Sequence, residues 1–325
     1  PHHFQTAKTM LGVIKNPTMG DADHTLKSGA EAVGVGESFY KTDVGIYFGE
    51  KGVTEKDPYF NGEGPDRTGC ELCGGCMVGC RYDGKNTLDK NYLYLAEKQG
   101  AHIIPEFTVT EVTPLEGIDS NGENGYSVTG IKSTSFIFKK RTKLTASKVV
   151  FSAGVLGTVK LLFEMKVKGL LPKLSSSLGE IVQTNSESII GMRVKGKKLD
   201  MSEGIAIGSG IYLDKDTHIE ATRYPLGSDS LNYITTILVK GGEGISRPLE
   251  YFKQIILHPL NFLRTLNPIH FARQTLILLC MQTKAGHMKF NYKRPFFNPF
   301  RRRLATQVIG QKIPTFIPSA NKFAT

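Results

Sequence analysis

The feature of this 325-residue sequence that most constrains its fold is an apolar run that ends in small residues and leads directly into a helical pattern. The run covers Lys148–Gly154, and the helical pattern covers Val155–Val167. A buried strand that turns into a helix is typical of half a dinucleotide-binding α/β unit, in which the helix N-terminus favours an anion. Small residues at such a turn, here Ala153 to Thr158, also serve ordinary packing, so the motif alone leaves both interpretations open.

A Gly-x-Gly-x-x-Gly motif between a strand and a helix is absent from the sequence. Such a motif holds the pyrophosphate in the complete dinucleotide-binding unit. If a dinucleotide binds, we expect its main phosphate loop upstream of residue 1. The sequence also starts without Met and stops after residues 318–325 without a closing element, so we interpret it as an internal fragment.

The second half of the chain has a different pattern, in which short alternating segments indicate strands. We expect them at residues 204–213, 218–224, 231–239, 275–282 and 287–292. The predicted fold class is therefore α+β with α/β: part of a Rossmann-like domain joined to an antiparallel-sheet domain with a helical insertion. We divide the chain into a helical and loop segment (1–66), a partial cofactor-binding domain (67–195) and an incomplete substrate-binding sheet domain (196–325).

The elements expected between these regions are one helix and a group of strands. The helix covers residues 88–99, with Thr87 as its N-cap. We expect strands at residues 102–104 and 107–112, followed by a pair formed by residues 126–133 and 136–144.

The formal net charge of +11 comes partly from short basic clusters at Lys139–Lys143 and Arg301–Arg303. Such clusters are usually solvated surface, and no stacking aromatic residues or recognised motif accompany them, so we expect no nucleic-acid partner. The longest apolar stretch, near residues 276–281, is far shorter than a transmembrane helix requires. We expect a cytoplasmic location or one at a membrane surface, and the sequence does not predict an oligomeric state.

Residues 246–273 form a basic amphipathic insertion that Pro259 and Pro268 divide into short pieces. Its apolar side carries Leu249, Phe252, Ile256, Leu260 and Leu263, and its other side carries Lys253, His258, Arg264 and Arg273. This pattern fits a helix packed on its own domain, a lid over an apolar substrate, or a peripheral contact with an anionic membrane.

Four of the five cysteines lie within eleven residues, as Cys70, Cys73, Cys76 and Cys80. Their spacing matches a ferredoxin run, although Arg81 replaces the usual Pro and the fourth Cys of that run normally serves a second cluster. Three interpretations compete: a metal site with an iron–sulfur cluster or zinc, a disulfide, and small packing residues in a tight loop.

Several segments occur in an order and at a spacing that resemble the steroid-oxidising branch of the glucose–methanol–choline family of FAD-dependent oxidoreductases. The resemblance extends from about residue 1 to about residue 292 and weakens after Asn185; it does not explain the cysteines. The segments that carry it are Gly84–Leu93, the strand to Val109, Phe151–Leu162, Leu171–Ser175, Leu178-Gly179 and Thr184-Asn185.

The resemblance implies FAD as the cofactor and assigns roles to individual residues. Val109 would hold the adenine through its backbone, Gly154 and Gly157 would border the ribose and pyrophosphate, and Asn91 and Tyr92 would lie on the flavin side. The implied catalytic residues are Asn185, near the isoalloxazine ring, and Glu220, which would exchange a proton with the substrate. Glu220 also fits an ordinary surface glutamate of a strand.

The implied reaction is oxidation of the CH–OH group of an apolar alcohol, a sterol above all, by hydride transfer to the flavin. The alternatives are a long-chain alcohol or another dehydrogenase of the family with an iron–sulfur cluster, and an inactive substrate-domain fragment. Because the phosphate loop and the family's C-terminal His and Asn lie outside the sequence, we expect the isolated 325 residues to be inactive.

Overall fold

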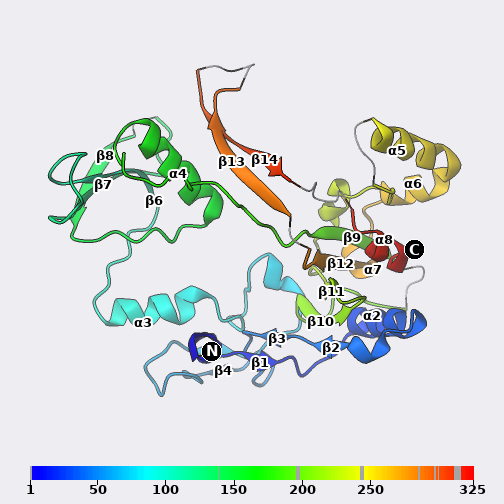
Figure 1. Ribbon diagram of the computed structural model, residues 1–325. Coiled ribbons are helices and arrows are strands. Elements are labelled where there is room, and N and C mark those ends of the chain that lie inside the picture. Colours follow the sequence, from blue (N-terminus) through cyan, green and yellow to red (C-terminus); the bar gives the residue numbers. More distant parts are fainter. Residues whose placement is uncertain are drawn as a thin grey trace. The chain divides into compact units, whose positions relative to one another are not determined.

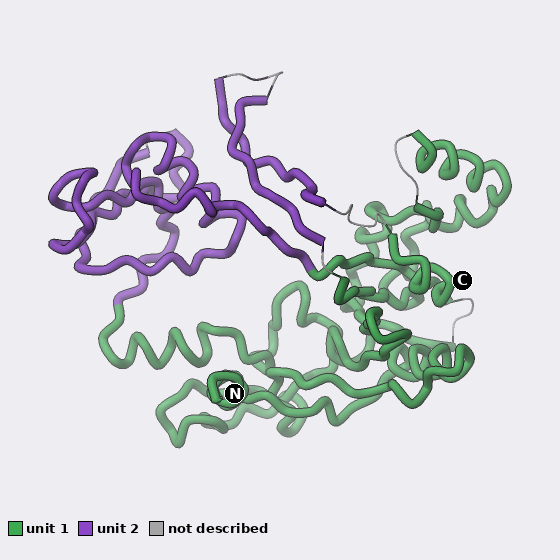
Figure 2. Tube along the Cα trace, in the orientation of Figure 1, with its two compact units in different colours: residues 1–101, 185–284, 314–325 green, residues 102–184, 285–313 purple. Residues whose placement is uncertain are grey.

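The computed structural model describes residues 2–137, 139–194, 198–241, 245–284, 286–295, 298, 300–310 and 316–325. The chain divides into two compact units, each assembled from separate stretches (Figure 2). Unit 1 contains residues 1–101, 185–284 and 314–325, and unit 2 contains residues 102–184 and 285–313. The predicted boundary between residues 195 and 196 lies outside the described residues, and the assignment of segments to cofactor and substrate domains stays a prediction.

Unit 1 contains most of the helices and the largest sheet (Figure 1). Its helices, with short 3-10 turns labelled η, are α1 (His2–Met10), α2 (Asp21–Ala32), η1 (Gly36–Ser38), η2 (Gly75–Met77), η3 (Leu88–Lys90), α3 (Tyr92–Lys98), η4 (Asp229–Ile234), α5 (Ser246–Leu257), α6 (Pro259–Thr265), α7 (Phe271–Gln274) and α8 (Pro318–Phe323). Its strands are β1 (Ile14–Lys15), β2 (Tyr40–Lys41), β3 (Asp43–Val44), β4 (Thr54–Glu55), β5 (Arg67–Thr68), β9 (Ser188–Arg193), β10 (Ile207–Tyr212), β11 (Thr217–Thr222) and β12 (Thr275–Gln282).

The five-stranded antiparallel sheet of unit 1 has the order β2-β10-β11-β12-β9. Glu220 of β11 lies opposite Gly210 of β10 and Leu279 of β12, and Tyr40 of β2 also lies opposite Gly210. Side chains alternate between the faces of a strand, so each strand contributes to both faces. This confirms the antiparallel sheet that the sequence predicted for β10, β11 and β12.

One face of this sheet forms the main hydrophobic core. Helix α2 contributes Ala22, Leu26 and Ala30, and Ile317 and Ala320 belong to the same cluster at the C-terminal end of the chain. The sheet contributes Ile190, Ile211, Ile219, Ala221, Leu276, Leu278 and Cys280, all of them buried. The alternate residues of the same strands point away from this core, and we call their side of the sheet the open face.

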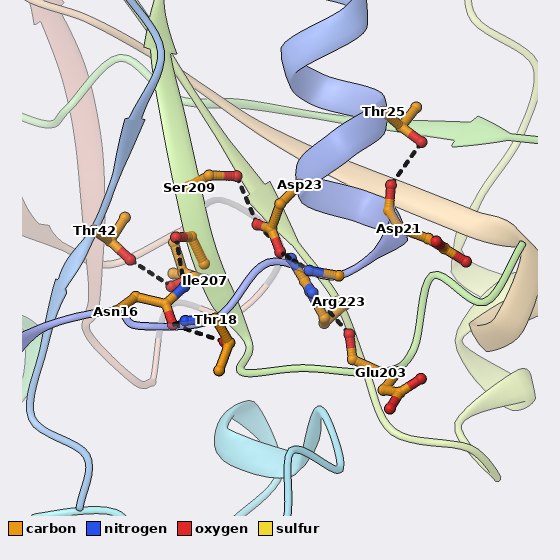
Figure 3. A network of polar contacts seen from close by, with 12 residues as sticks. Asn16, Thr18, Asp21, Asp23, Thr25, Thr42, Glu203, Ile207, Ser209 and Arg223 are labelled. Atoms are coloured by element: carbon orange, nitrogen blue, oxygen red, sulfur yellow. Dashed lines mark hydrogen bonds and ion pairs between the residues drawn. The ribbon is translucent and has the colours of Figure 1, made fainter. Parts of the chain in front are cut away.

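A buried ion pair fixes α2 on the sheet (Figure 3). The carboxylate of Asp23 accepts hydrogen bonds from Arg223 Nη2 at 2.7 Å and from Ser209 Oγ at 2.6 Å. Its other oxygen accepts from the backbone N–H of Gly20 at 2.9 Å, which caps the start of the helix. Arg223, which directly follows β11, also donates to the carbonyl of Glu203, so one ion pair joins the helix to strand β10, to the end of β11 and to a loop.

Unit 2 contains a three-stranded sheet, one helix and a hairpin. The strands are β6 (Phe107–Pro114), β7 (Tyr126–Lys132) and β8 (Arg141–Ala146), in that order, and the helix is α4 (Val155–Val167). Met165 of α4 and Val112 of β6 are both buried and in contact. The hairpin pairs β13 (His287–Lys293) with β14 (Arg303–Ile309). The predicted pairing of β7 with the following segment is confirmed, although β8 begins only at Arg141 and residue 138 lies outside the described residues.

Several predicted elements are wrong. Residues 148–154 form no strand: Val150 is 85% exposed, and no strand among the described residues pairs with this run. An apolar run cannot form a buried strand without neighbours to satisfy its backbone and cover its faces. Residues 102–104 and 235–239 are also irregular, and residues 229–234 form the 3-10 turn η4.

Two further predictions need correction in their details. The predicted helix at 88–99 is the turn η3 followed by α3, and Asn91, not Thr87, caps α3 through its side chain. The predicted strand at 287–292 exists as β13, but it pairs with β14 and not with the five-stranded sheet.

Helices α5 and α6 lie on the surface of unit 1, and neither contains a buried residue. The helical segment is interrupted between them at His258, so Pro259 divides it as the sequence predicted, and Pro259 occupies the first turn of α6. Among the described helices, none combines the length and apolar character that crossing a membrane requires.

Candidate functional site

The open face of the five-stranded sheet brings together the titratable side chains of the candidate site. Tyr40 of β2, Tyr212 of β10, and His218 and Glu220 of β11 lie on this face. Apolar side chains of β12 and β9 continue it, namely Ile277, Leu279, Met281 and Ile189. A surface that is polar on one side and apolar on the other can orient a ligand with one polar group on an apolar body.

Glu220 lies near the centre of this face and is half-buried. Its side chain is 21% exposed, and its Oε1 lies 3.9 Å from Nε2 of His218. Burial raises the pKa of Glu220, and the negative charge of Glu187 raises it further. A carboxylate with a raised pKa is a stronger base than one in water, which suits the acceptance of a proton near neutral pH.

Asn185 precedes β9 and lies beside the last residue of β12, Gln282. Its side chain is exposed and donates to Glu187 Oε2 at 2.8 Å, and its carbonyl accepts from the backbone N–H of Gln282 at 3.2 Å. Because Glu187 binds Asn185 and also acts on the pKa of Glu220, it links the two predicted catalytic residues. Their catalytic roles stay predictions.

Asn91 and Tyr92 belong to unit 1 and lie where η3 meets α3. Asn91 is fully buried; its amide donates to the carbonyl of Thr87 at 2.9 Å, and its side-chain oxygen accepts from the N–H of Tyr92 at 2.7 Å. Its side chain therefore serves as a helix cap, while Tyr92 is exposed. Their predicted position beside a flavin stays a prediction.

The other three predicted cofactor residues lie in unit 2. Val109 is part of β6, beside an irregularity in its pairing with β7. Gly154 precedes α4 with a φ of 78°, which favours glycine, and an added Cβ at either Gly154 or Gly157 would meet open space. A helix N-terminus with open space around its first glycines fits the ribose or a phosphate of a dinucleotide.

The cysteine loop does not form the predicted metal site. Cys70, Cys73, Cys76 and Cys80 are free thiols that line one small pocket, but the described part of the chain holds no group of three or more metal-binding side chains. Burial raises the pKa of Cys70 to about 11 and also raises that of Cys76, so both thiols are protonated near neutral pH. The iron–sulfur and zinc interpretations are therefore unsupported.

Packing accounts for the geometry of this loop. Gly74 and Gly204 connect through a 2.7 Å backbone hydrogen bond, and Gly204 donates in turn to Leu72. Gly74 has a φ of 70°, and any side chain on it would collide with the carbonyl of Ser202. Small residues let the loop approach residues 202–204 closely, which agrees with the third interpretation of the cysteines.

A cavity of about 850 Å³ lies beside the sheet, between β9, β12 and the helical insertion. Its lining includes Gly191, Leu238, Gln254, Arg264, Phe271 and Thr275. Thr275 is buried, and its hydroxyl has no hydrogen-bond partner among the described residues. A buried hydroxyl of this kind normally pairs with a water or a ligand.

Sequence reasoning missed the residues that surround Glu220. His218 could have been found, because a residue two positions before Glu220 on a strand shares its face. Tyr40 lies 180 positions before Glu220 in the sequence, and no local pattern connects it with β11. Glu187 was missed because strand β9, which follows it, was not predicted.

Comparison with known proteins first defines a class. Residues 63–167 match the family model of the GMC oxidoreductases, so the resemblance to the glucose–methanol–choline family is confirmed. The family match implies FAD as the cofactor.

Individual relatives give a more specific comparison than the family model does. The chain is 50% identical over 327 residues to a cholesterol oxidase of Acinetobacter baumannii, which covers 99% of this chain and 58% of that protein. It is 38% identical over 331 residues to cholesterol oxidases of two Mycobacterium tuberculosis strains, covering 98% of this chain and 56% of those proteins. The chain thus spans little more than half the length of these relatives.

Proposed function

We propose that this chain forms part of an FAD-dependent oxidoreductase that oxidises the CH–OH group of an apolar alcohol, with a sterol as the substrate. The observation that carries this proposal is the half-buried Glu220 on the open face, with its raised pKa and its apolar neighbours. The cholesterol oxidases to which the chain is similar support the choice of a sterol.

The proposed chemistry divides between the protein and the cofactor. When bound, FAD supplies the hydride acceptor. We propose that Glu220 accepts the proton of the substrate hydroxyl through its carboxylate, and that Asn185, whose amide is hydrogen-bonded to Glu187, orients the reacting groups. On the cofactor side, we propose that Gly154, Gly157 and Val109 hold the ribose, phosphate and adenine part, and that Asn91 and Tyr92 adjoin the flavin.

The substrate side has room for a large apolar molecule. The cavity of about 850 Å³ borders the sheet at Gly191 of β9 and Thr275 of β12. Its volume falls in the range of small-molecule binding sites. We propose that the cavity and the apolar side chains of β9 and β12 surround the body of the alcohol, whose hydroxyl reaches Glu220.

The test of this function is Glu220→Gln in the FAD-loaded enzyme. Because the amide cannot accept the proton, kcat with cholesterol should fall by roughly 10²- to 10⁴-fold, with a smaller change in KM. The matched control is Glu97→Gln, the same substitution at an exposed position of α3. A Glu220→Gln enzyme with kcat within twofold of the wild type would exclude Glu220 as the base. Turnover of a linear long-chain alcohol without turnover of cholesterol would exclude the sterol and assign the alternative substrate.

We also propose that the insertion at residues 246–273 contacts an anionic lipid surface. Leu249, Phe252 and Ile256 of α5 and Leu260 and Leu263 of α6 are each more than half exposed. Arg247, Lys253 and Arg264 supply positive charge on the same two helices. An exposed apolar side flanked by basic residues suits the boundary between acidic headgroups and acyl chains.

Flotation with lipid vesicles tests this contact. The wild-type protein should float with phosphatidylglycerol vesicles more than with phosphatidylcholine vesicles, and high salt should weaken the binding. Replacing Phe252 and Ile256 by Ser should reduce binding, whereas the control Phe4→Ser, at an equally exposed apolar position of α1, should not. Equal recovery of the wild type and the double variant would overturn the proposal.

A further inference from the structure

Three aromatic rings from three neighbouring strands are stacked beside Glu220. Tyr40 and His218 have ring centroids 5.8 Å apart, and Tyr212 and His218 have centroids 4.8 Å apart. Their planes differ by only 18° and 25°. The three rings come from β2, β10 and β11, so the cluster exists only when the sheet is assembled.

A glycine lets the tyrosine cross one strand to reach this cluster. Tyr40 and Glu220 both lie opposite Gly210 of β10. A Cβ atom at Gly210 would lie 2.5 Å from Oη of Tyr40 and 2.7 Å from the adjacent ring carbon. The Tyr40 ring therefore occupies the space over Gly210 where a side chain would otherwise stand, and its hydroxyl reaches β11.

The hydroxyl of Tyr40 is hydrogen-bonded to Nε2 of His218, and the same nitrogen faces Glu220 at 3.9 Å. Burial lowers the pKa of His218, which favours the neutral imidazole. Burial and the charge of Glu220 raise the pKa of Tyr40, so its hydroxyl keeps its proton. Tyr40 O–H is then the donor and Nε2 the acceptor.

The surroundings contain few other charges. The titratable groups that act on this cluster are Tyr212 of β10 and Glu187, which precedes β9. On β12, the residues opposite Glu220 and His218 are Leu279 and Met281, which are apolar. A protonated His218 would place the nearest cation within reach of Glu220 and would lower the pKa of its carboxyl group.

We propose that Tyr40 and His218 are positioning residues for Glu220: the tyrosine hydroxyl occupies Nε2, keeps the imidazole neutral and thereby keeps a cation away from the base. The inference rests on the proposed function of Glu220. It assigns a role to Gly210 as well, because only a residue without a side chain leaves the path of the tyrosine free.

Tyr40→Phe tests the inference with a readout that needs no turnover. Without the hydroxyl, Nε2 loses its donor and the pKa of His218 should rise, which NMR of ¹³Cε1-labelled histidine in the 325-residue chain can measure; His218→Gln assigns the resonance. Gly210→Ala, which displaces the ring but keeps the hydroxyl, should raise the pKa in the same direction. The matched control is Tyr212→Phe, which keeps the stacked ring and should leave the pKa of His218 unchanged.

In the FAD-loaded enzyme, Tyr40→Phe should move the acidic limb of the kcat/KM profile to lower pH by about one unit, because an imidazolium beside Glu220 stabilises its carboxylate. A folded Tyr40→Phe chain whose His218 pKa is unchanged overturns the inference, while the effect of Glu220→Gln still decides the proposed function. If the His218 pKa rises but Glu220→Gln leaves turnover intact, the hydrogen bond is real and the positioning role is excluded together with the proposed function.

Discussion

The two faces of the five-stranded sheet come from alternate residues of the same strands, yet they differ in chemistry. On β11, Ile219 and Ala221 are fully buried in the core, whereas His218 and Glu220 point to the open face and keep about a fifth of their side chains exposed. The packed face supplies stability, and the open face carries groups with shifted pKa values. A rigid strand can hold such groups in place because its alternate residues anchor it.

The largest effect should come from breaking the ion pair that fixes α2 on the packed side. Arg223→Ala leaves the Asp23 carboxylate buried without its cation and should lower the free energy of unfolding by about 3–5 kcal/mol. The control is Arg273→Ala, which breaks the half-exposed pair with Asp200 and should cost about 1 kcal/mol or less. Urea unfolding of the 325-residue chain measures both, and equal losses would contradict the distinction between buried and exposed pairs.

A neighbouring pair of leucines compares the two faces directly. Leu278→Ala on the packed face creates a cavity and should lower the free energy of unfolding by about 2–5 kcal/mol. Leu279→Ala on the open face should lower it clearly less, and should instead raise KM for an apolar alcohol in the loaded enzyme. Similar losses of stability from the two substitutions would show that the open face is also packed in solution.

The smallest effect should appear in the pH dependence of stability. The pKa of His218 is lower in the folded protein than in the unfolded chain, so the unfolded chain binds more protons just below pH 6.5. Stability should therefore fall as the pH drops through this range, and His218→Gln should remove part of that loss. Glu220 has the opposite effect, because its pKa is higher in the folded protein than in the unfolded chain. The stability that this difference contributes is lost as the pH rises above the pKa that Glu220 has in the unfolded chain, and Glu220→Gln should reduce that loss. Thermal unfolding from pH 5 to 8 separates the two slopes, and parallel curves would contradict both assignments.

The sequence predicted those elements whose own residues determine them. Helix α4 and strand β12 have the expected bounds, because each has a strong local pattern and clear ends. The prediction of a strand at residues 148–154 was wrong, because a strand forms only beside neighbouring strands and a local sequence pattern does not show whether they are present. Strand β13 was expected in the substrate sheet but pairs with β14, since alternation predicts a strand and not its partner.

The candidate site was predictable only in part. The resemblance pointed to Glu220, which lies on β11, and to Asn185, which precedes β9 and is hydrogen-bonded to Glu187; the negative charge of Glu187 also raises the pKa of Glu220. Tyr40 escaped prediction because its contact with His218 depends on strand order and on the missing side chain of Gly210. The cysteine spacing left a metal site, a disulfide and packing residues as alternatives, because spacing does not specify whether thiols converge on one point or pack separately.

The order of strands in this sheet has a consequence for synthesis on the ribosome. The edge strand β2 is the first of the five strands along the chain, but β12, which lies between β11 and β9, ends 242 residues after Tyr40, and α8 completes the core later still. At the usual elongation rate of about 5–20 residues per second, roughly 10–50 seconds separate the synthesis of β2 from that of the end of β12. Throughout that interval the apolar residues of α2 lack the strands that cover them. We therefore expect the nascent chain to need protection by chaperones more than a protein of local hairpins would.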